Sequence, residues 1–184
     1  MYIFPEYNWV FEHADYSNFK KGEIKCPYER RSTYKDCEVE DYLLNFQHMA
    51  EWIENNYYEV PGEKMCLDKD ILYKGNKIYS RKTCIFVPQR INNLFVKNDK
   101  SRGKNPIGVD QLPSGNYRVN CSNRYGKYIY LGSYSTKEEA FKVYKEYKEK
   151  VIKEVIDSYE GKIPEPFYSK LKTAMYNYKV EIDD

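Results

Sequence analysis

Three short segments with alternating apolar and polar side chains lie within residues 107–134, and they constrain the fold more than any other feature of the chain. The segments IGVDQL, NYRVNCS and KYIYLGSY are joined by PSG and NRYG, which are both typical of tight turns. In the second segment Val119 and Cys121 alternate with polar residues, and in the third Ile129 alternates with tyrosines. We predict a three-stranded antiparallel sheet with one apolar face and one polar, aromatic face.

A long amphipathic helix is expected directly after this sheet. Ser135 and Thr136 precede Glu138 and Glu139, which is the pattern of a capped helix N-terminus. Apolar and aromatic residues then recur at helical spacing: Ala140, Tyr144, Tyr147, Val151, Val155 and Tyr159. Gly161 ends the helix. We expect the helix to lie across the apolar face of the sheet, and the tail after it to add a short helix that packs back on one of the domains.

The upstream part of the chain has the order strand, loop, strand, helix. MCLDKDI and CIFVP are predicted to be short strands, and PQRINNLFVK is predicted to be a helix beginning at Pro88. Before them, EDYLLNFQHMAEWIENNYY predicts a helix from about Val39 to Asn56, rich in aromatic residues.

The polar segment KNDKSRGKNP separates these two patterned regions. We therefore predict an N-terminal domain at residues 1–96, a linker at 97–105 and a C-terminal domain at 106–184. The expected class is α+β, in which a ββα module with an aromatic helix precedes the three-stranded sheet and its long helix.

The overall charge does not mark the chain as a nucleic-acid-binding protein. There are 30 basic and 28 acidic residues, for a net charge of +2, so any such binding must come from a local surface. The 21 tyrosines can build cores and can also stack on bases. The sequence contains neither an uncharged apolar run of about eighteen residues nor an N-terminus typical of a signal peptide, so we expect an intracellular protein.

The five cysteines include no CxxC pair, which favours reduced thiols. The main interpretation is that they are small buried apolar side chains. A zinc site remains as an alternative, although its spacings match no familiar zinc-binding pattern. Its ligands would be Cys26, Cys37, Cys66 and Cys84.

The downstream pattern resembles the APETALA/ERF-type DNA-binding domain over about forty residues, GVDQLPSGNYRVNCSNRYGKYIYLGSYSTKEEAFKVYKEYK. The resemblance consists of Gly-Val, a turn, a strand, Leu-Gly, an aromatic residue, Thr, and Glu-Glu-Ala opening a helix. The matching positions are Gly108, Val109, Gly115, Leu131, Gly132, Tyr134, Thr136, Glu138, Glu139, Ala140 and Tyr144.

This resemblance implies that the polar face of the sheet lies in the DNA major groove. The implied contact residues are Asp110, Arg118, Asn120, Ser122, Tyr128 and Tyr130, and the alternation places all but Asp110 on the polar face. Arg118 is expected to contact guanine or phosphate, and Asn120 adenine. Where plant members of the family carry arginines, this chain has Asp110 and Leu112, which weakens phosphate attraction. Alternatively, the polar face is merely solvated or docks on a protein.

The upstream module resembles HNH-type endonuclease relatives encoded by bacteriophages, which often carry an APETALA-type domain as well. The resemblance lies in YKDCEVEDYLLNFQHMAEW, LDKDILYKGNKIYS, TCIFVPQRINNLF and RGKNPIGV. Together the two resemblances cover most of residues 34–160 and imply a phage or prophage origin.

An active HNH site needs a histidine as general base and a metal ion to stabilise the leaving oxygen. The two histidines, His13 and His48, both precede the module. Lys69 occupies the expected position of the base, and the neighbouring carboxylates favour its charged form. We therefore interpret the module as degenerate. The alternative is magnesium-dependent cleavage, with Asp68, Lys69, Asp70 and Asn92 as catalytic residues and Asp68, Asp70 and Asn92 as metal ligands.

The upstream module also has a basic side that could follow a phosphate backbone, although a solvated charged face is the commoner outcome. Lys77 and Arg90 are the predicted contacts on this side, and Asn76 is expected to hold its loop through backbone bonds. The basic residues are Lys69, Lys74, Lys77, Arg81, Lys82 and Arg90.

Two functions from different classes follow from these patterns. The first is a phage nucleic-acid-binding protein, derived from an HNH homing-type endonuclease, that contacts DNA with its C-terminal sheet and needs Mg²⁺ only if it cuts. The second is a non-catalytic, anti-CRISPR-like counter-defence protein that binds a host effector protein or its guide RNA complex. A plain transcription regulator would leave the upstream module without a role. In each case we expect a protein of the host cytoplasm with no membrane partner.

Overall fold

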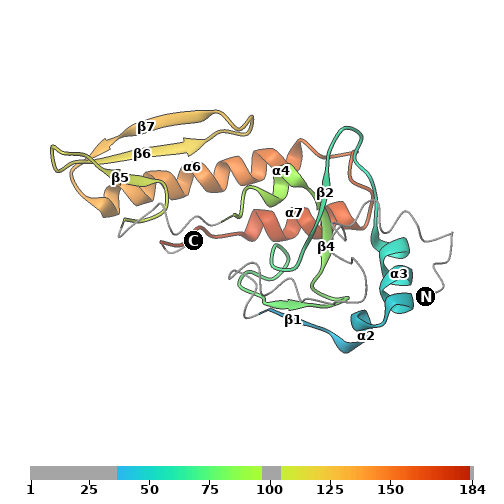
Figure 1. The fold of residues 1–184 in the computed structure, drawn as a ribbon. Coiled ribbons are helices and arrows are strands. Elements are labelled where there is room, and N and C mark those ends of the chain that lie inside the picture. The colour runs from blue at the N-terminus through green and yellow to red at the C-terminus, as the bar shows by residue number, and fades with distance from the viewer. Residues whose placement is uncertain (1–36, 97–104, 183–184) are drawn as a thin grey trace. The chain divides into compact units, whose positions relative to one another are not determined.

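The computed structural model describes residues 37–96 and 105–182, and its helices and strands form a mixed α+β fold (Figure 1). The chain divides into two compact units after Gln89, inside the short helix α4 (Gln89–Asn92), so residues 90–96 group with the second unit. The predicted linker at residues 97–105 lies outside the described residues except for Asn105. The predicted α+β class is confirmed.

In the first unit, the helix predicted from about Val39 to Asn56 is interrupted. The structure has α2 (Asp41–Leu44) and α3 (Phe46–Asn56), separated by an extended Asn45. The Asn45 side-chain oxygen accepts hydrogen bonds from the backbone N–H groups of Gln47 (3.0 Å) and His48 (3.3 Å). Asparagine is among the preferred residues at a helix N-cap, and this local bond ends one helix and begins the next.

The core of the first unit lies around two antiparallel strands, β2 (Met65–Asp68) and β4 (Ile85–Pro88). All four residues of β4 are buried, and Val87 has no exposed surface. The ring of Trp52 from α3 stacks on Phe86 at a centroid distance of 5.9 Å. The Tyr58 hydroxyl donates to the Phe86 carbonyl (2.7 Å), which satisfies a polar group inside this core. The two predicted strands are confirmed.

A second, parallel strand pair was not predicted. It joins β1 (Glu38–Val39) to β3 (Ile78–Tyr79). The pairing is reinforced by Arg81, which follows β3 and binds the Glu40 carboxylate at 2.7 Å. Two-residue strands are too short to give an alternating pattern, so only the partner segment defines them.

The helix predicted to begin at Pro88 is a single turn. After α4, the N–H of Leu94 donates to the Ile91 carbonyl (3.0 Å) and the N–H of Phe95 donates to the Asn92 carbonyl (3.1 Å). These bonds span three residues and belong to turns, so the prediction of a longer helix was wrong. Asn92 and Asn93 explain the stop, because asparagine side chains compete for backbone hydrogen bonds and disfavour helix interiors.

The second unit contains the predicted three-stranded antiparallel sheet. Its strands are β5 (Val109–Gln111), β6 (Tyr117–Ser122) and β7 (Tyr128–Tyr134), with β6 in the centre. Val109 pairs with Val119, and both are buried on the apolar face. A register shift after Val119 leaves Leu131 without a partner in β6 and moves Ser133, rather than Gly132, onto the polar face.

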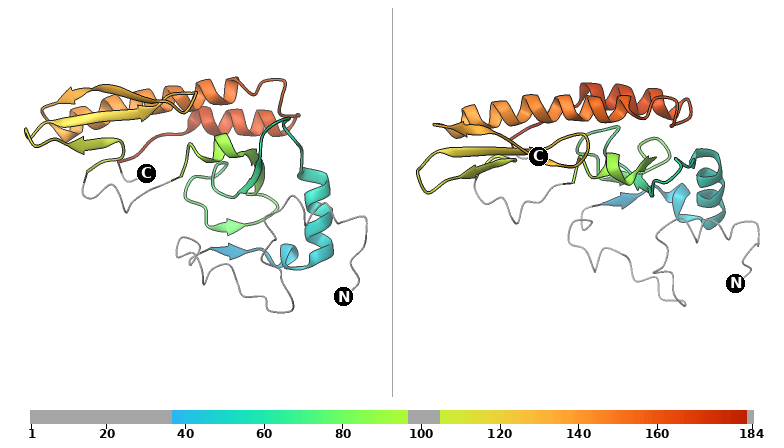
Figure 2. Two further views of the ribbon diagram at one scale, coloured as in Figure 1. Left: turned by 45° about the horizontal axis from the view of Figure 1, so that its top comes forward. Right: turned by 90° about the horizontal axis from the view of Figure 1, so that it is seen from above.

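The long helix α6 (Lys137–Asp157) covers the apolar face of this sheet (Figures 1 and 2). The Thr136 hydroxyl caps it by accepting from the Glu139 N–H at 3.2 Å, as the sequence predicted. The ring of Tyr144 lies so close to Gly108 that a Cβ atom there would sit 2.1 Å from it. Glycine at this position therefore allows the helix to approach β5.

The C-terminal tail forms α7 (Phe167–Asn177), which packs against α6 and buries Tyr168, Leu171 and Met175. The segment after α7 is also bound to α6. The Lys145 amine donates to the Val180 carbonyl (2.5 Å), and the Val180 N–H donates to the Glu149 carboxylate (3.0 Å). The predicted return of the tail is confirmed. Within residues 37–96 and 105–182, no helix has both the length and the apolar character needed to span a bilayer.

Candidate nucleic-acid interface

The strand pairing gathers seven side chains on the polar face of the second unit's sheet, which we call the outer face. Asp110, Arg118 and Ser133 lie in one row across the three strands. Asn120 lies beside Tyr130, and Ser122 beside Tyr128. The sequence placed Arg118, Asn120, Ser122, Tyr128 and Tyr130 on this face. The structure adds Ser133 and places Asp110, a contact residue that the family resemblance implied, on the same face, where both pair directly with Arg118.

Two tyrosines dominate the exposed surface of the outer face. Tyr128 is 79% exposed and Tyr130 is 62% exposed, although both belong to a regular strand. Helix α6 packs on the opposite face of the sheet (Figure 2), and α7 packs on α6. Single exposed aromatic side chains are common on protein surfaces, whereas exposed rings that lie together on one face can mark an interaction site.

Arg118 already has a partner on the outer face. Its guanidinium lies 3.1 Å from the Asp110 carboxylate, and both side chains are about half exposed. An ion pair in such contact with water contributes little to stability. Its main effect is to cancel the charge of Arg118, so the outer face attracts phosphate less strongly than a lone arginine would.

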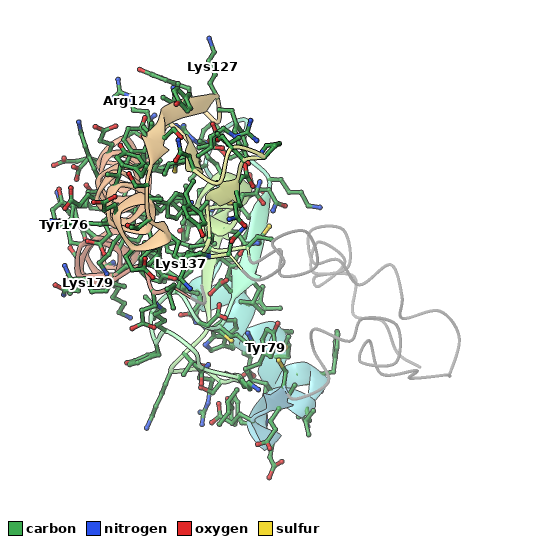
Figure 3. All side chains as sticks on the ribbon, turned by 90° about the vertical axis from the view of Figure 1, so that its left-hand side faces the viewer. Tyr79, Arg124, Lys127, Lys137, Tyr176 and Lys179 are labelled. Carbon is green, nitrogen blue, oxygen red and sulfur yellow. The ribbon has the colours of Figure 1, made fainter. Side chains whose placement is uncertain are left out.

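The turn between β6 and β7, residues 123–127, carries two exposed cations, Arg124 and Lys127, directly before Tyr128. The side-chain oxygen of Asn123 accepts from the N–H groups of Tyr125 (2.9 Å) and Lys127 (3.0 Å) and so organises the turn. Figure 3 labels Arg124 and Lys127 near each other at the top of the view, and both side chains are exposed. The Arg124 guanidinium lies 4.7 Å from the centre of the Tyr125 ring.

Sequence reasoning missed this group, which we call the hairpin tip (Arg124, Tyr125 and Lys127). The segment NRYG was interpreted only as turn chemistry. The signal available in the sequence was the alternation of basic and aromatic residues in NRYGKYIY, directly before the strand that carries the exposed tyrosines.

The two other predicted contact residues lie outside the outer face. The Arg90 guanidinium donates to the backbone carbonyl of Arg124 and lies 6.0 Å from the Tyr159 ring centre. It therefore supports the hairpin tip from within the second unit. Lys77 is exposed in the first unit, just before β3. Among its basic neighbours, Lys69 and Arg81 form ion pairs with Asp70 and Glu40.

The candidate catalytic segment of the first unit is a tightly bonded loop. Asp68 ends β2 and is 9% exposed. One of its carboxylate oxygens accepts from the N–H groups of Asp70 (2.8 Å) and Ile71 (2.7 Å), which turns the chain. As the sequence predicted, Asn76 holds the rest of the loop, donating to the carbonyls of Lys69 (2.7 Å) and Ile78 (2.8 Å).

The pKa of Asp68 is raised to about 6, mainly because burial disfavours the charged carboxylate and secondly because Asp70 is a nearby negative charge. The two backbone N–H donors oppose this shift but do not cancel it. A buried carboxylate with a pKa near neutrality can transfer protons, yet its oxygen here is engaged in holding the loop.

Two other predicted catalytic residues, Lys69 and Asn92, belong to different units of the chain. The Lys69 amine binds the Asp70 carboxylate at 3.2 Å, and Asn92 belongs to the second unit. His48 stacks on Tyr42 in the first unit with a centroid distance of 4.1 Å, and His13 lies outside the described residues. Across residues 37–96 and 105–182, no three His, Cys, Asp or Glu side chains are grouped so as to hold a metal ion.

The described cysteines, Cys37, Cys66, Cys84 and Cys121, are free thiols. Cys84 is buried, and burial raises the pKa of its thiol to about 11, which keeps it protonated and unreactive. The alternative zinc site included Cys26, which lies outside the described residues.

Comparisons of this chain with family models, curated proteins and solved structures found no match.

Proposed function

We propose that this protein binds nucleic acid, and that the outer face of the second unit's sheet contacts DNA. The observation that carries this proposal is the exposure of Tyr128 (79%) and Tyr130 (62%) on a regular strand whose other face is packed on α6. Asn120 and Ser122 lie beside these rings and offer hydrogen-bonding groups for base edges or the backbone. The hairpin tip adds two cations, Arg124 and Lys127, directly before the strand that carries the two tyrosines.

Cleavage of the bound nucleic acid is not part of the proposal. The candidate general base, Lys69, pairs with Asp70, and Asp68 holds the backbone of its own loop. The upstream module then serves folding or additional nucleic-acid contact. The two sequence resemblances support an origin in a phage-encoded HNH endonuclease that has lost its general base.

The proposal is tested by titrating the protein into fluorescently labelled DNA and following anisotropy. We expect Arg118→Ala to weaken binding by about threefold to tenfold. The substitution removes a phosphate or base contact, and it leaves the negative charge of Asp110 on the outer face without its partner. The fold should be retained, since the side chain points away from α6. Unchanged affinity would rule out Arg118 as a contact, and no binding at all by the wild-type protein would refute the proposal.

A second function, inhibition of a host defence protein, is favoured by one observation. The ion pair between Arg118 and Asp110 leaves the outer face with little net charge, and tyrosine-rich surfaces of that kind also occur in protein interfaces. The same titration separates the two functions. A counter-defence protein of this class would leave DNA anisotropy unchanged and would be recovered with a host effector after nuclease treatment of infected cells.

A further inference from the structure

We propose that the outer face takes single-stranded nucleic acid, with successive bases stacked on Tyr128 and Tyr130 and the backbone held by Arg124 and Lys127. This inference rests on the proposed function and specifies its substrate. The ligand is a single strand, and the experiment compares DNA with RNA.

The charge on the outer face is too small for a duplex-binding surface. Of its seven residues, Arg118 carries the one positive charge, and Asp110 binds it at 3.1 Å. Duplex binding draws most of its affinity from several lysines and arginines that neutralise phosphates on both strands. Here those contacts would have to come from the hairpin tip alone, at one end of the sheet.

The two tyrosines provide what a single strand needs instead. Tyr128 and Tyr130 are two residues apart on one face of β7, so their Cα atoms lie about 7 Å apart. They lie on the regular side of the register shift, opposite Ser122 and Asn120. That spacing leaves room for one base on each ring. Within the described residues, neither ring makes a hydrogen bond or a ring contact that would have to be broken first.

The preference for a single strand over a duplex depends on which part of a base the Tyr128 and Tyr130 rings can contact. In a duplex, both flat faces of each base are covered by the neighbouring base pairs, and only the edges are open in the grooves. In a single strand the faces are available, and aromatic side chains stack on them with little regard for sequence. Exposed rings beside few cations therefore suit a single strand better than a groove.

The hairpin tip fits the backbone of the same strand. Lys127 directly precedes Tyr128, and Arg124 lies three residues before it in the turn that Asn123 organises. Arg90 further fixes the turn by donating to the Arg124 carbonyl. Tyr125 is 66% exposed and adds a third ring, covered on one side by the Arg124 guanidinium. Cations followed by a row of rings are the usual arrangement of single-strand binders.

The experiment compares three labelled ligands by anisotropy: a single-stranded DNA of about 12 nucleotides, the RNA of the same sequence, and the DNA duplex. The full chain is used as wild type, as Tyr128→Ala/Tyr130→Ala, and as Tyr128→Phe/Tyr130→Phe, which keeps the rings. Tyr73→Ala is the matched control, because Tyr73 is 57% exposed in the first unit. Circular dichroism checks that each variant is folded.

We expect the wild type to bind at least one single strand about tenfold more tightly than the duplex, and the alanine variant to lose about tenfold per ring. The phenylalanine variant and Tyr73→Ala should stay within about twofold of wild type. Tighter binding of the duplex would overturn this inference and leave the proposed function standing. A preference for single strands that survives the alanine variant would place the site elsewhere and overturn it as well. If none of the ligands binds, both the inference and the proposed function fail.

Discussion

The outer face and the loop after β2 are both rich in polar side chains, but they differ in how far those side chains are exposed and in whether they bond to the backbone. On the outer face, Tyr128 and Tyr130 are exposed and make no hydrogen bond with the described residues. In the loop, Asp68 is nearly buried and accepts two backbone N–H bonds, and Asn76 donates to two carbonyls. A polar side chain is more readily available to a ligand where it is exposed and its atoms do not hold the backbone of the fold. By that criterion the sheet, and not the loop, is the better candidate site.

The largest effect should distinguish two substitutions of Asp68. Asp68→Asn keeps an oxygen that can accept both N–H bonds, whereas Asp68→Ala leaves the donors of Asp70 and Ile71 without it. We expect the alanine variant to be about 2 kcal/mol less stable than the asparagine variant. Urea unfolding followed by Trp52 fluorescence measures this in the first unit, in a Trp9→Phe background that leaves one tryptophan. Equal stabilities would mean that Asp68 does not hold the loop.

Acidification should stabilise the first unit through the same residue. The folded-state pKa of Asp68, about 6, is above its unfolded value, so the folded protein binds an extra proton between these two values. Stability should therefore rise by about 1 kcal/mol as pH falls from about 7 to about 5, and it should level off below the unfolded pKa. The Asp68→Asn variant, measured in parallel, subtracts the contribution of all other groups. A difference curve that is flat with pH would contradict a raised pKa.

The hairpin tip should control the salt dependence of binding. Removing both cations in Arg124→Ala/Lys127→Ala should weaken single-strand binding by about tenfold and reduce the slope of log K against log salt by about 1.4, or 0.7 for each phosphate contact. Lys142→Ala/Lys170→Ala is the control with the same loss of charge, since both lysines are exposed on α6 and α7. If the control variant changes the slope equally, the effect is one of overall charge and not of the hairpin tip.

The smallest effect is expected on the outer face itself. Asp110→Asn removes the carboxylate that neutralises Arg118, so nucleic-acid affinity should increase by about threefold at low salt. Glu146→Gln, an exposed position on α6, provides the same change in net charge away from the sheet. Anisotropy titrations of the two variants side by side measure the difference. Weaker binding by Asp110→Asn would mean that the carboxylate itself contacts the ligand.

Local patterns in the sequence were enough to predict the second unit. The period-two alternation, the PSG and NRYG turns and the Thr136 cap all act between near neighbours, and the structure has the expected sheet, long helix and returning tail. The face on which Arg118, Asn120 and Tyr130 lie also follows from alternation alone, because neighbouring residues of a strand point to opposite sides.

Other features depended on contacts between distant segments, and the sequence could not supply them. The strand pair β1 and β3 exists only because two segments about forty residues apart meet. The ion pair of Arg118 with Asp110 depends on the register of β5 against β6, and the burial of Asp68 depends on what packs over its loop. The sequence by itself determined which residue types were present and the face on which Arg118, Asn120, Ser122, Tyr128 and Tyr130 lie, whereas Asp110 and Ser133 were placed by the strand register. Only the tertiary structure decided which of their atoms remain available to a ligand, because availability is set by burial and by hydrogen-bond partners from elsewhere in the chain.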